Sequence, residues 1–571
     1  MQISSAFGAL IWVVTSYILY AIISNFIISR RHAAKARELK CEEPPFEKNR
    51  WPLGIDNLLR ALAADKAQQF PVDIIKRFED LGAHTYRYQI LGARNIRTAD
   101  PKNIQTILAN KFNDFDVGPS RRGNFLPMLG NGIFTADGDH WKHSRAIIRP
   151  QFTRDQVSDL NLEETHVQNL MKLIGPMIGS NGWIEQIDLL PYFFRLTIDS
   201  ATEFLFGEPV NSQLRFLPGY QSSKLGSKEE RFATAFDSGQ MALATRSRFM
   251  DSWWLYDSLA FRNSCKIVHD FVDHFVQLAL SRGLREKVSD TNSGGKEQYI
   301  FLEAIAAETQ NPTELRSELL HVLLAGRDTT ASHLGWVFHN LARDPVRYKK
   351  LRDIIIDEFG TYENPSEITF AKLKACKYLR YVNDESLRLY PVVPINARYA
   401  NKDTTLPRGG GKDGNSPIFI PKGSSTDFSV HVMHRRKDIW GPDADEFKPE
   451  RWEGRKVGWE YLPFNGGPRI CIGQQFALIE ASYVTVRLLQ RFDRMESLDK
   501  DAVVGHNLTL INCIANGVKT RSSIEFDGQT SQNDDQLRTI VEKPLVQKRS
   551  RCPLPAEAKL PKSRKPIGTA S

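Results

Sequence analysis

The stretch FNGGPRICIGQQFA (residues 464–477) places one cysteine, Cys471, in a loop of glycine, proline and arginine directly before a predicted helix. A cysteine retained only for packing is expected in an apolar run, and this one is not in such a run. The loop glycines let backbone N–H groups approach the sulfur, and the positive end of the following helix points toward it. Both features stabilise a negative charge on sulfur, so the loop predicts a functional thiolate.

Three uses suit such a thiolate: nucleophile, redox sensor and metal ligand. A nucleophile needs a histidine as base, and this loop contains none, although a neighbour in space could supply one. Arg469 suits a bound carboxylate and Phe464 offers an apolar planar face. Together with the cysteine, this combination points to haem, whose iron can take an axial cysteine and whose propionates need cations.

The same loop carries a family pattern. F-x-x-G-x-R-x-C-x-G is filled by Phe464, Gly467, Arg469, Cys471 and Gly473, and it resembles the haem-binding loop of the cytochromes P450. The resemblance implies haem b with its iron bound by the Cys471 thiolate. It also implies a mainly α fold with small β-sheets and a long central helix over the haem. Further motifs in the order found in that family extend the resemblance over roughly residues 53–525.

The first of these motifs is LLHVLLAGRDTTASHLGWVFHNLARDP (residues 319–345). A start signal at residues 313–314 and a stop at Pro345 predict one long helix. The segment AGRDTT groups poor helix formers, whose side chains compete for backbone carbonyls and are expected to open the helix locally. A surface patch with a tolerated glycine is the alternative. The resemblance implies that Thr329 hydrogen-bonds the oxygen bound at the iron and that Asp328 passes protons toward it.

A second motif predicts a structural brace. Glu385 and Arg388, in DESLRLYP, are three residues apart and therefore share one helix face. FKPERW (residues 447–452) follows at the family's spacing, and the resemblance implies a buried triad of Glu385, Arg388 and Arg451. Trp452 stands where a phenylalanine is commoner.

A third motif, DGDHWKHSRAIIRPQF, places Trp141 and Arg145 one helical turn apart. From the residues alone, a core tryptophan beside a surface arginine explains this spacing equally well. The resemblance implies that both residues, together with Arg398, reach a haem propionate.

The N-terminus predicts a membrane anchor. Residues 7–28 are 22 residues without a charge, about 33 Å as a helix, which is enough to span a bilayer. The segment is too long for a signal-peptide core and lacks a small-residue cleavage site. Five basic residues follow within residues 30–40, so we expect a single-pass protein of the endoplasmic reticulum membrane with its catalytic domain in the cytosol.

Charge and cysteine usage argue against several other classes of protein. Residues 541–571 carry a net +6 and residues 30–40 a net +4, against +9 for the chain, so the remaining body is near neutral and no nucleic-acid partner is expected. The six cysteines show no C-x-x-C spacing, which indicates neither a disulfide framework nor a zinc site. The glycine-rich run at residues 407–414 lacks P-loop spacing and predicts a turn in a sheet.

The predicted organisation is an anchor (1–30), a basic, proline-marked linker (31–55), a haem-thiolate monooxygenase domain (56–525) and a basic disordered tail (526–571).

A narrower resemblance concerns the substrate. AGRDTTASHLGW, DTTLPRGGGKDGNSPIFIPKGS and FNGGPRICIGQQFAL are similar to fungal cytochromes P450 that hydroxylate alkanes and fatty acids at or near the terminal carbon. A terpenoid or polyketide substrate is the alternative, since composition does not separate these apolar compounds. The chain has no room for a flavin domain, so electrons are expected from a separate NADPH-cytochrome reductase, with cytochrome b5 as an optional second donor. Two alternatives from other classes remain: a haem-thiolate isomerase or dehydratase, and a haem sensor without turnover. The intact pair Asp328 and Thr329 argues against both.

Overall fold

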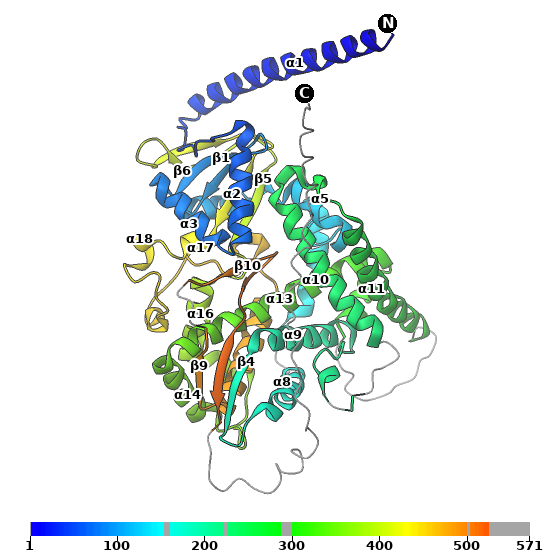
Figure 1. The fold of residues 1–571 in the computed structure, drawn as a ribbon, viewed down its shortest axis with the longest axis vertical. Coiled ribbons are helices and arrows are strands. Elements are labelled where there is room, and N and C mark those ends of the chain that lie inside the picture. Colours follow the sequence, from blue (N-terminus) through cyan, green and yellow to red (C-terminus); the bar gives the residue numbers. More distant parts are fainter. Residues whose placement is uncertain are drawn as a thin grey trace, which may run out of the picture. The chain divides into compact units, whose positions relative to one another are not determined.

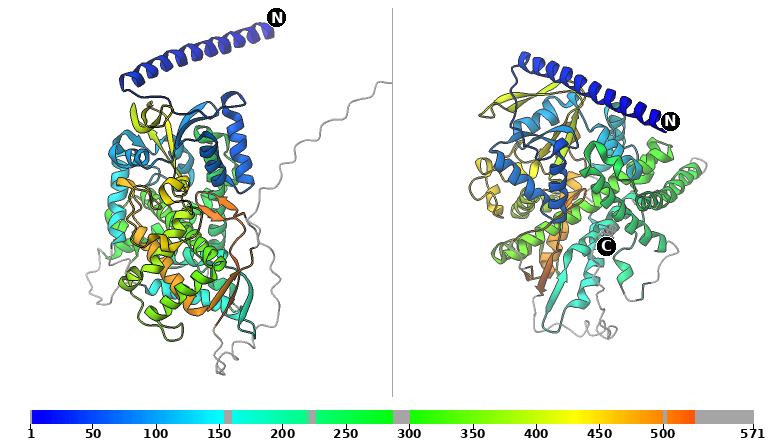
Figure 2. Two further views of the ribbon diagram at one scale, coloured as in Figure 1. Left: turned by 90° about the vertical axis from the view of Figure 1, so that its left-hand side faces the viewer. Right: turned by 45° about the horizontal axis from the view of Figure 1, so that its top comes forward.

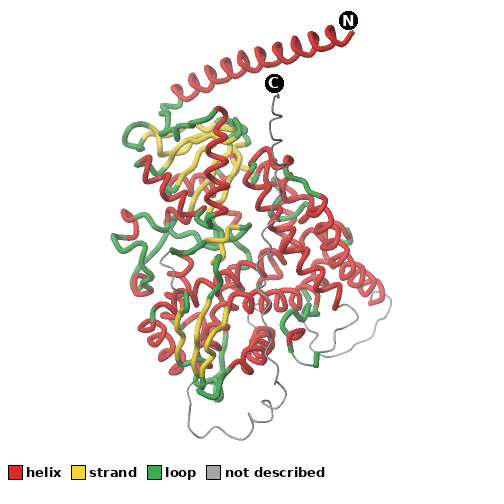
Figure 3. Tube along the Cα trace, viewed as in Figure 1, coloured by secondary structure: helices red, strands yellow, loops and turns green. Residues whose placement is uncertain are grey.

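The computed structural model describes residues 2–153, 160–217, 219–220, 226–286, 300–499 and 503–524. Its contacts divide the chain into residues 1–525 and residues 526–571, and the predicted basic tail lies outside the described residues. The described chain is mainly helical with small sheets, as predicted (Figure 3).

One long helix, α13 (Pro312–Arg343), forms the centre of the fold (Figure 1). The Asn311 side chain caps it by accepting hydrogen bonds from the N–H groups of Thr313 (3.0 Å) and Glu314 (3.4 Å). It ends shortly before Pro345, so the predicted start and stop are confirmed. Most of its residues between 315 and 342 are buried, which shows that the helix is surrounded by other elements.

The other helices pack around α13 or cover the sheets. Those in the first half of the chain are α2 (Ile55–Lys66), α3 (Phe70–Leu81), α4 (Pro101–Gln105), α5 (Gly118–Leu129), α6 (Gly138–Ile148), α8 (Asn161–Ile174), α9 (Leu189–Phe206), α10 (Gly226–Arg248) and α11 (Leu259–Glu286). Those in the second half are α12 (Phe301–Glu308), α14 (Pro345–Phe359), α15 (Phe370–Ala375), α16 (Lys377–Leu389), α17 (Val430–Met433), α18 (Lys437–Trp440) and α19 (Gln474–Arg491). Helices α9, α11, α16 and α19 contact α13 directly.

The strands of the described residues form two sheets and two hairpins. The five-stranded sheet has the order β1 (Thr85–Ile90), β2 (Ala93–Thr98), β8 (Ser425–Ser429), β5 (Ile395–Ala400), β3 (Phe115–Asp116), and its β2–β8 pair is parallel. The three-stranded sheet is antiparallel, in the order β4 (Trp183–Asp188), β12 (Lys519–Ser523), β9 (Arg494–Ser497). The hairpins pair β6 (Thr404–Gly410) with β7 (Ser416–Ile420) and β10 (His506–Leu508) with β11 (Asn512–Ile514). Figures 1 and 2 show the two sheets at opposite ends of the helical region.

The predicted linker packs on the five-stranded sheet and the β6–β7 hairpin. Arg87 of β1 donates its N–H to the Pro45 carbonyl, and the Glu47 N–H donates to the Arg87 carbonyl, each at 2.8 Å. The predicted glycine-rich turn also contacts this segment, because a side chain at Gly410 would meet the Glu42 carbonyl oxygen at 2.7 Å. The glycine therefore allows the two backbones to approach closely.

Helix α1 (Gln2–Glu38) includes the predicted membrane span. Among the residues that the structure describes, none of the helices combines the length and apolar character needed to cross a bilayer. Several side chains of residues 2–21 are outside the description. The anchor therefore stays a prediction.

Candidate active site

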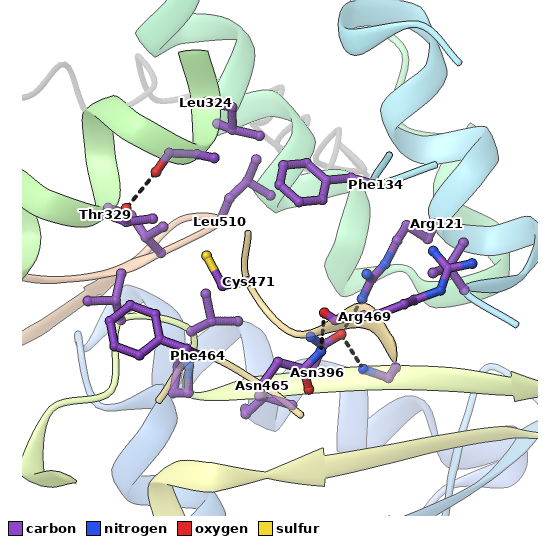
Figure 4. Close-up of a pocket in the computed structure, with 18 of the residues that line it drawn as sticks. Arg121, Phe134, Leu324, Thr329, Asn396, Phe464, Asn465, Arg469, Cys471 and Leu510 are labelled. Carbon is purple, nitrogen blue, oxygen red and sulfur yellow. Dashed lines mark hydrogen bonds between the residues drawn. The ribbon is translucent and has the colours of Figure 1, made fainter. Parts of the chain in front are cut away.

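The Cys471 loop is shaped by its backbone. The Cys471 N–H donates to the Phe464 carbonyl at 3.0 Å, which closes the loop. Gly467 has φ +68° and lies against the Leu108 carbonyl, so a side chain there would be strained and would clash. Helix α19 begins at Gln474, just after the loop, as predicted. These constraints turn the Cys471 sulfur toward an internal cavity (Figure 4).

The cavity has a volume of about 600 Å³ and separates Cys471 from the middle of α13. Ala325, Gly326 and Thr329 line the α13 side, and Phe464 lines the wall beside the sulfur (Figure 4). The Cys471 side chain is exposed to the cavity, and desolvation by the surrounding protein raises the pKa of its thiol, although the Gly473 N–H and Arg145 act in the opposite direction. A thiolate in this position would therefore gain from a cation facing it, such as a metal ion.

Arginines gather beside the Cys471 loop. Arg469, Arg398 (β5) and Arg121 (α5) all line the cavity, and Figure 4 shows Arg121 and Arg469 on the same side of Cys471. The Asn396 side-chain oxygen accepts hydrogen bonds from Arg121 and, at 3.2 Å, from Arg398. Arg469 pairs with Asp137 at 2.8 Å.

Two of these guanidinium groups, those of Arg121 and Arg398, lack a paired carboxylate among the described residues, whereas Arg469 has Asp137. Burial, and then the charge of Arg469, lowers the pKa of Arg121 to about 10. Burial and then Arg121 hold the pKa of Arg398 well below its usual value. In the described part of the chain, neither Arg121 nor Arg398 forms an ion pair within 4.0 Å, and the buried Nε of Arg469 has no hydrogen-bond partner. The cluster thus fits a ligand with more than one carboxylate.

Trp141 and Arg145 also line the cavity, on α6. The Arg469 guanidinium lies 4.4 Å from the Trp141 ring centroid, and Arg145 donates to the Ile470 carbonyl at 3.2 Å. The structure therefore brings together Cys471, Phe464, Arg469, Trp141, Arg145 and Arg398, all six of the predicted cofactor-binding residues. Sequence reasoning missed Arg121, since no motif marks it.

Thr329 and Asp328 lie on different sides of α13. Thr329 lines the cavity, and its hydroxyl donates to the Ala325 carbonyl at 2.5 Å. This is the predicted competition for a backbone carbonyl. The helix nevertheless remains continuous, so the expected local opening is wrong: the bond is made within one turn, which the helix accommodates.

Asp328 faces α10 rather than the cavity lining. One of its oxygens lies 3.3 Å from Arg327, which pairs with Asp237, and the Asp237 side chain is 58% exposed. Burial raises the pKa of Asp328 to about 6, although Arg327 favours the charged form. A carboxyl group that titrates near neutral pH thus lies between the central helix and the surface.

The predicted brace forms on the α16 side of the Cys471 loop. Glu385 accepts from Arg388 at 2.8 and 2.9 Å and from Arg451 at 3.2 Å, and the Glu385 and Arg388 side chains are fully buried. The Trp452 indole N–H adds a bond to Glu385 at 3.0 Å that a phenylalanine could not make. The unusual tryptophan therefore belongs to the brace.

Comparison with known proteins decides the family. The family model described as "Cytochrome P450" matches residues 44–504. The chain belongs to the cytochrome P450 family. Members of this family hold haem through a cysteine thiolate, and in this P450 the cavity, the facing Cys471 and the arginine cluster beside it fit haem and its two propionates.

Several relatives of this P450 come from fungi. It is 45% identical to "Cytochrome P450 monooxygenase alt2" of Alternaria solani over 86% of this chain and 93% of the relative. It is 50% identical to "Cytochrome P450 52A5" of Candida maltosa over 72% of this chain and 77% of the relative. It is 43% identical to "Cytochrome P450 52A6" of Candida tropicalis over 85% and 91%. This P450 is thus a haem-thiolate monooxygenase that acts on an apolar substrate.

Proposed function

We propose that this P450 hydroxylates a long-chain fatty acid or an n-alkane at or near its terminal carbon. The observation that carries the proposal is the cavity, whose lining is mostly apolar from the Cys471 loop to the 508–511 turn and α3. The similarity to cytochromes P450 of the 52A group supports the same substrate class.

Haem supplies the activation of dioxygen and the transfer of one oxygen atom into a C–H bond. The protein holds and orients it. Cys471 ligates the iron and Phe464 packs beside the loop. The propionates are bound by a set of residues at the Cys471 end of the cavity: Arg121, Trp141, Arg145, Arg398 and Arg469.

Protons reach the cavity from α13 in this proposal. Asp237 is open to solvent and pairs with Arg327, which lies beside Asp328. With a pKa of about 6, Asp328 exchanges protons with the surface near neutral pH. The Thr329 hydroxyl, which donates to the Ala325 carbonyl in this structure, then turns from it and presents its proton inside the cavity. Glu385, Arg388 and Arg451 keep a structural role.

Electron supply and membrane attachment complete the proposal. A separate NADPH-cytochrome reductase delivers electrons, with cytochrome b5 as an optional second donor. Residues 7–28 of α1 anchor the protein in the endoplasmic reticulum membrane, and the basic residues that follow keep the catalytic domain in the cytosol. Protease added to sealed microsomes should therefore digest the catalytic domain, whereas a lumenal domain would be protected.

The substrate is tested with purified protein, reductase and NADPH. The panel contains C12 to C18 acids, the matching alkanes and several terpenoids, with products located by mass spectrometry. We expect hydroxyl groups at or next to the terminal carbon of linear chains. Turnover of a polycyclic compound with no product from any linear chain would overturn the substrate class and leave the monooxygenase activity standing.

A further inference from the structure

Arg248, the last residue of α10, lines the cavity, and its side chain is 11% exposed. Its guanidinium pairs with Asp65 of α2 at 3.0 Å, and the Asp65 side chain is about one-third exposed. The Arg248 guanidinium also stacks over the Phe70 ring of α3, 4.6 Å from the ring centroid. Arg248 therefore sits at the rim of the cavity.

A single turn links this rim to the Cys471 loop. Arg248 donates to the Leu508 carbonyl at 2.8 Å. Three residues on, Ile511 packs in the same apolar cluster as Phe464. Residues 508–511 all line the cavity, so the turn forms a wall that runs from Arg248 toward Cys471. A linear substrate along this wall would have one end at the arginine and the other near the haem.

Arg248 has hydrogen-bonding capacity left over. Its Nε and Nη2 donate to Asp65 at 3.3 and 3.0 Å, and Nη2 also reaches Leu508. Within the described residues, its Nη1 donates to no group. A guanidinium has five N–H donors and stays charged, so the Nη1 pair can bind an anion while Asp65 remains in place.

Of the other two arginines that line the cavity away from the Cys471 loop, Arg77 is held by two carboxylates and Arg97 by one carboxylate and two hydroxyl groups, whereas Arg248 has one carboxylate. Arg77 pairs with Glu47 at 3.3 Å and with Asp73 at 2.8 Å. Arg97 pairs with the buried Asp427 and bonds the hydroxyl groups of two tyrosines. Arg248 is thus the better placed cation for an incoming carboxylate.

We propose that Arg248 is a specificity-determining residue that binds the carboxylate of a fatty-acid substrate through Nη1. This inference rests on the proposed function and names the contact that orients an acid within it. With the carboxylate held at the rim, the methyl end of the chain points toward Cys471, which directs oxidation to the terminal carbon. An alkane or an ester has no such anion and does not need this contact.

The test measures binding to the full-length holoenzyme by the substrate-induced shift of the haem Soret band. The ligands are dodecanoate, methyl dodecanoate and dodecane, which share one chain. Arg248→Leu should weaken dodecanoate about tenfold, the lower end for a charge-assisted hydrogen bond at a partly exposed site, and leave the two neutral ligands within about twofold. The hydroxylation of dodecanoate should spread inward from the terminal carbon, whereas that of dodecane should not change.

Two further variants separate recognition from bracing. Asp65→Asn removes the same ion pair but keeps Arg248, so dodecanoate should bind as tightly as to the wild type or more tightly. Arg248→Lys keeps the charge without the planar fork, and should weaken dodecanoate less than Arg248→Leu does. If Arg248→Leu fails to incorporate haem, dodecanoate binding to Arg248→Lys and to Asp65→Asn tests the role of Arg248 instead.

The outcomes that overturn the inference differ from those that overturn the substrate class. An equal loss of all three ligands in Arg248→Leu, or a loss of dodecanoate in Asp65→Asn, would make Arg248 a structural brace. Unchanged dodecanoate binding in Arg248→Leu would place the carboxylate elsewhere. If the wild type responds to none of the three ligands, the proposed function fails and this inference fails with it.

Discussion

Asp328→Asn should raise the free energy of unfolding and lower the amount of product formed per NADPH consumed. The Asp328 side chain is buried, and burial raises its pKa from 3.8 to about 6. At neutral pH the buried Asp328 carboxylate is therefore charged, and a neutral side chain at this position would make the folded state more stable. Asparagine has nearly the same shape and carries no charge, and Arg327 keeps Asp237 as a partner.

The pKa shift gives the magnitude and the pH window. Roughly two pKa units at about 1.4 kcal/mol each correspond to about 3 kcal/mol, and we expect about 1–3 kcal/mol because asparagine forms its own hydrogen bonds. Because the folded pKa is raised, the contribution of Asp328 to stability is full below pH 3.8 and is lost as the pH rises through about 6. The stabilisation by Asp328→Asn should therefore appear at pH 8 and vanish near pH 4.

Two assays check this prediction. The apparent urea midpoint at pH 8 and at pH 4.5 should show the pH-dependent gain. Product formation should fall by about 10²–10⁴-fold, the usual loss for a general acid. A variant that is less stable than the wild type at pH 8, or one with unchanged product per NADPH, would refute the reasoning.

Three other predictions follow from the same geometry. Thr329→Ala removes the hydroxyl group inside the cavity, so substrate binding should persist while NADPH is consumed to form peroxide; wild-type product per NADPH would contradict this role. Trp452→Phe removes one bond to the buried Glu385 and should cost about 1–3 kcal/mol in urea unfolding, with haem content retained; an unchanged midpoint would mean that the remaining donors suffice. Burial lowers the pKa of both His333 and His339 to about 4, so they favour the folded state above pH 6.5 and stability should fall progressively from there to about pH 4; His339→Gln should reduce that fall.

The sequence predicts the parts of this protein that local rules control. The cap ahead of α13 and the proline after it fix the helix ends through nearest neighbours. Glu385 and Arg388 share a helix face by spacing alone. The Cys471 loop is set by a glycine whose positive φ other residues adopt only with strain. For these elements a motif carries most of the physical information.

Features that depend on distant segments could not be predicted in this way. Arg121 and Arg248 enter the cavity from α5 and α10, and only the tertiary arrangement places them beside Asn396 and Asp65. The bonds between the predicted linker and strand β1 also form only in the folded chain, because Pro45 and Glu47 are distant from Arg87 in the sequence. The helix α13 stays continuous although the Thr329 hydroxyl bonds the Ala325 carbonyl, and composition alone does not reveal this.

The central claim is that Cys471 holds haem in this cavity. The most direct measurement is the absorption spectrum of the reduced protein with carbon monoxide, for the wild type and for Cys471→Ala, with Cys265→Ala and Cys376→Ala as matched controls at buried cysteines outside the cavity lining. The wild type and both controls should show the long-wavelength Soret band that gives the P450 family its name, and Cys471→Ala should lack it. Persistence of that band in Cys471→Ala would contradict the account.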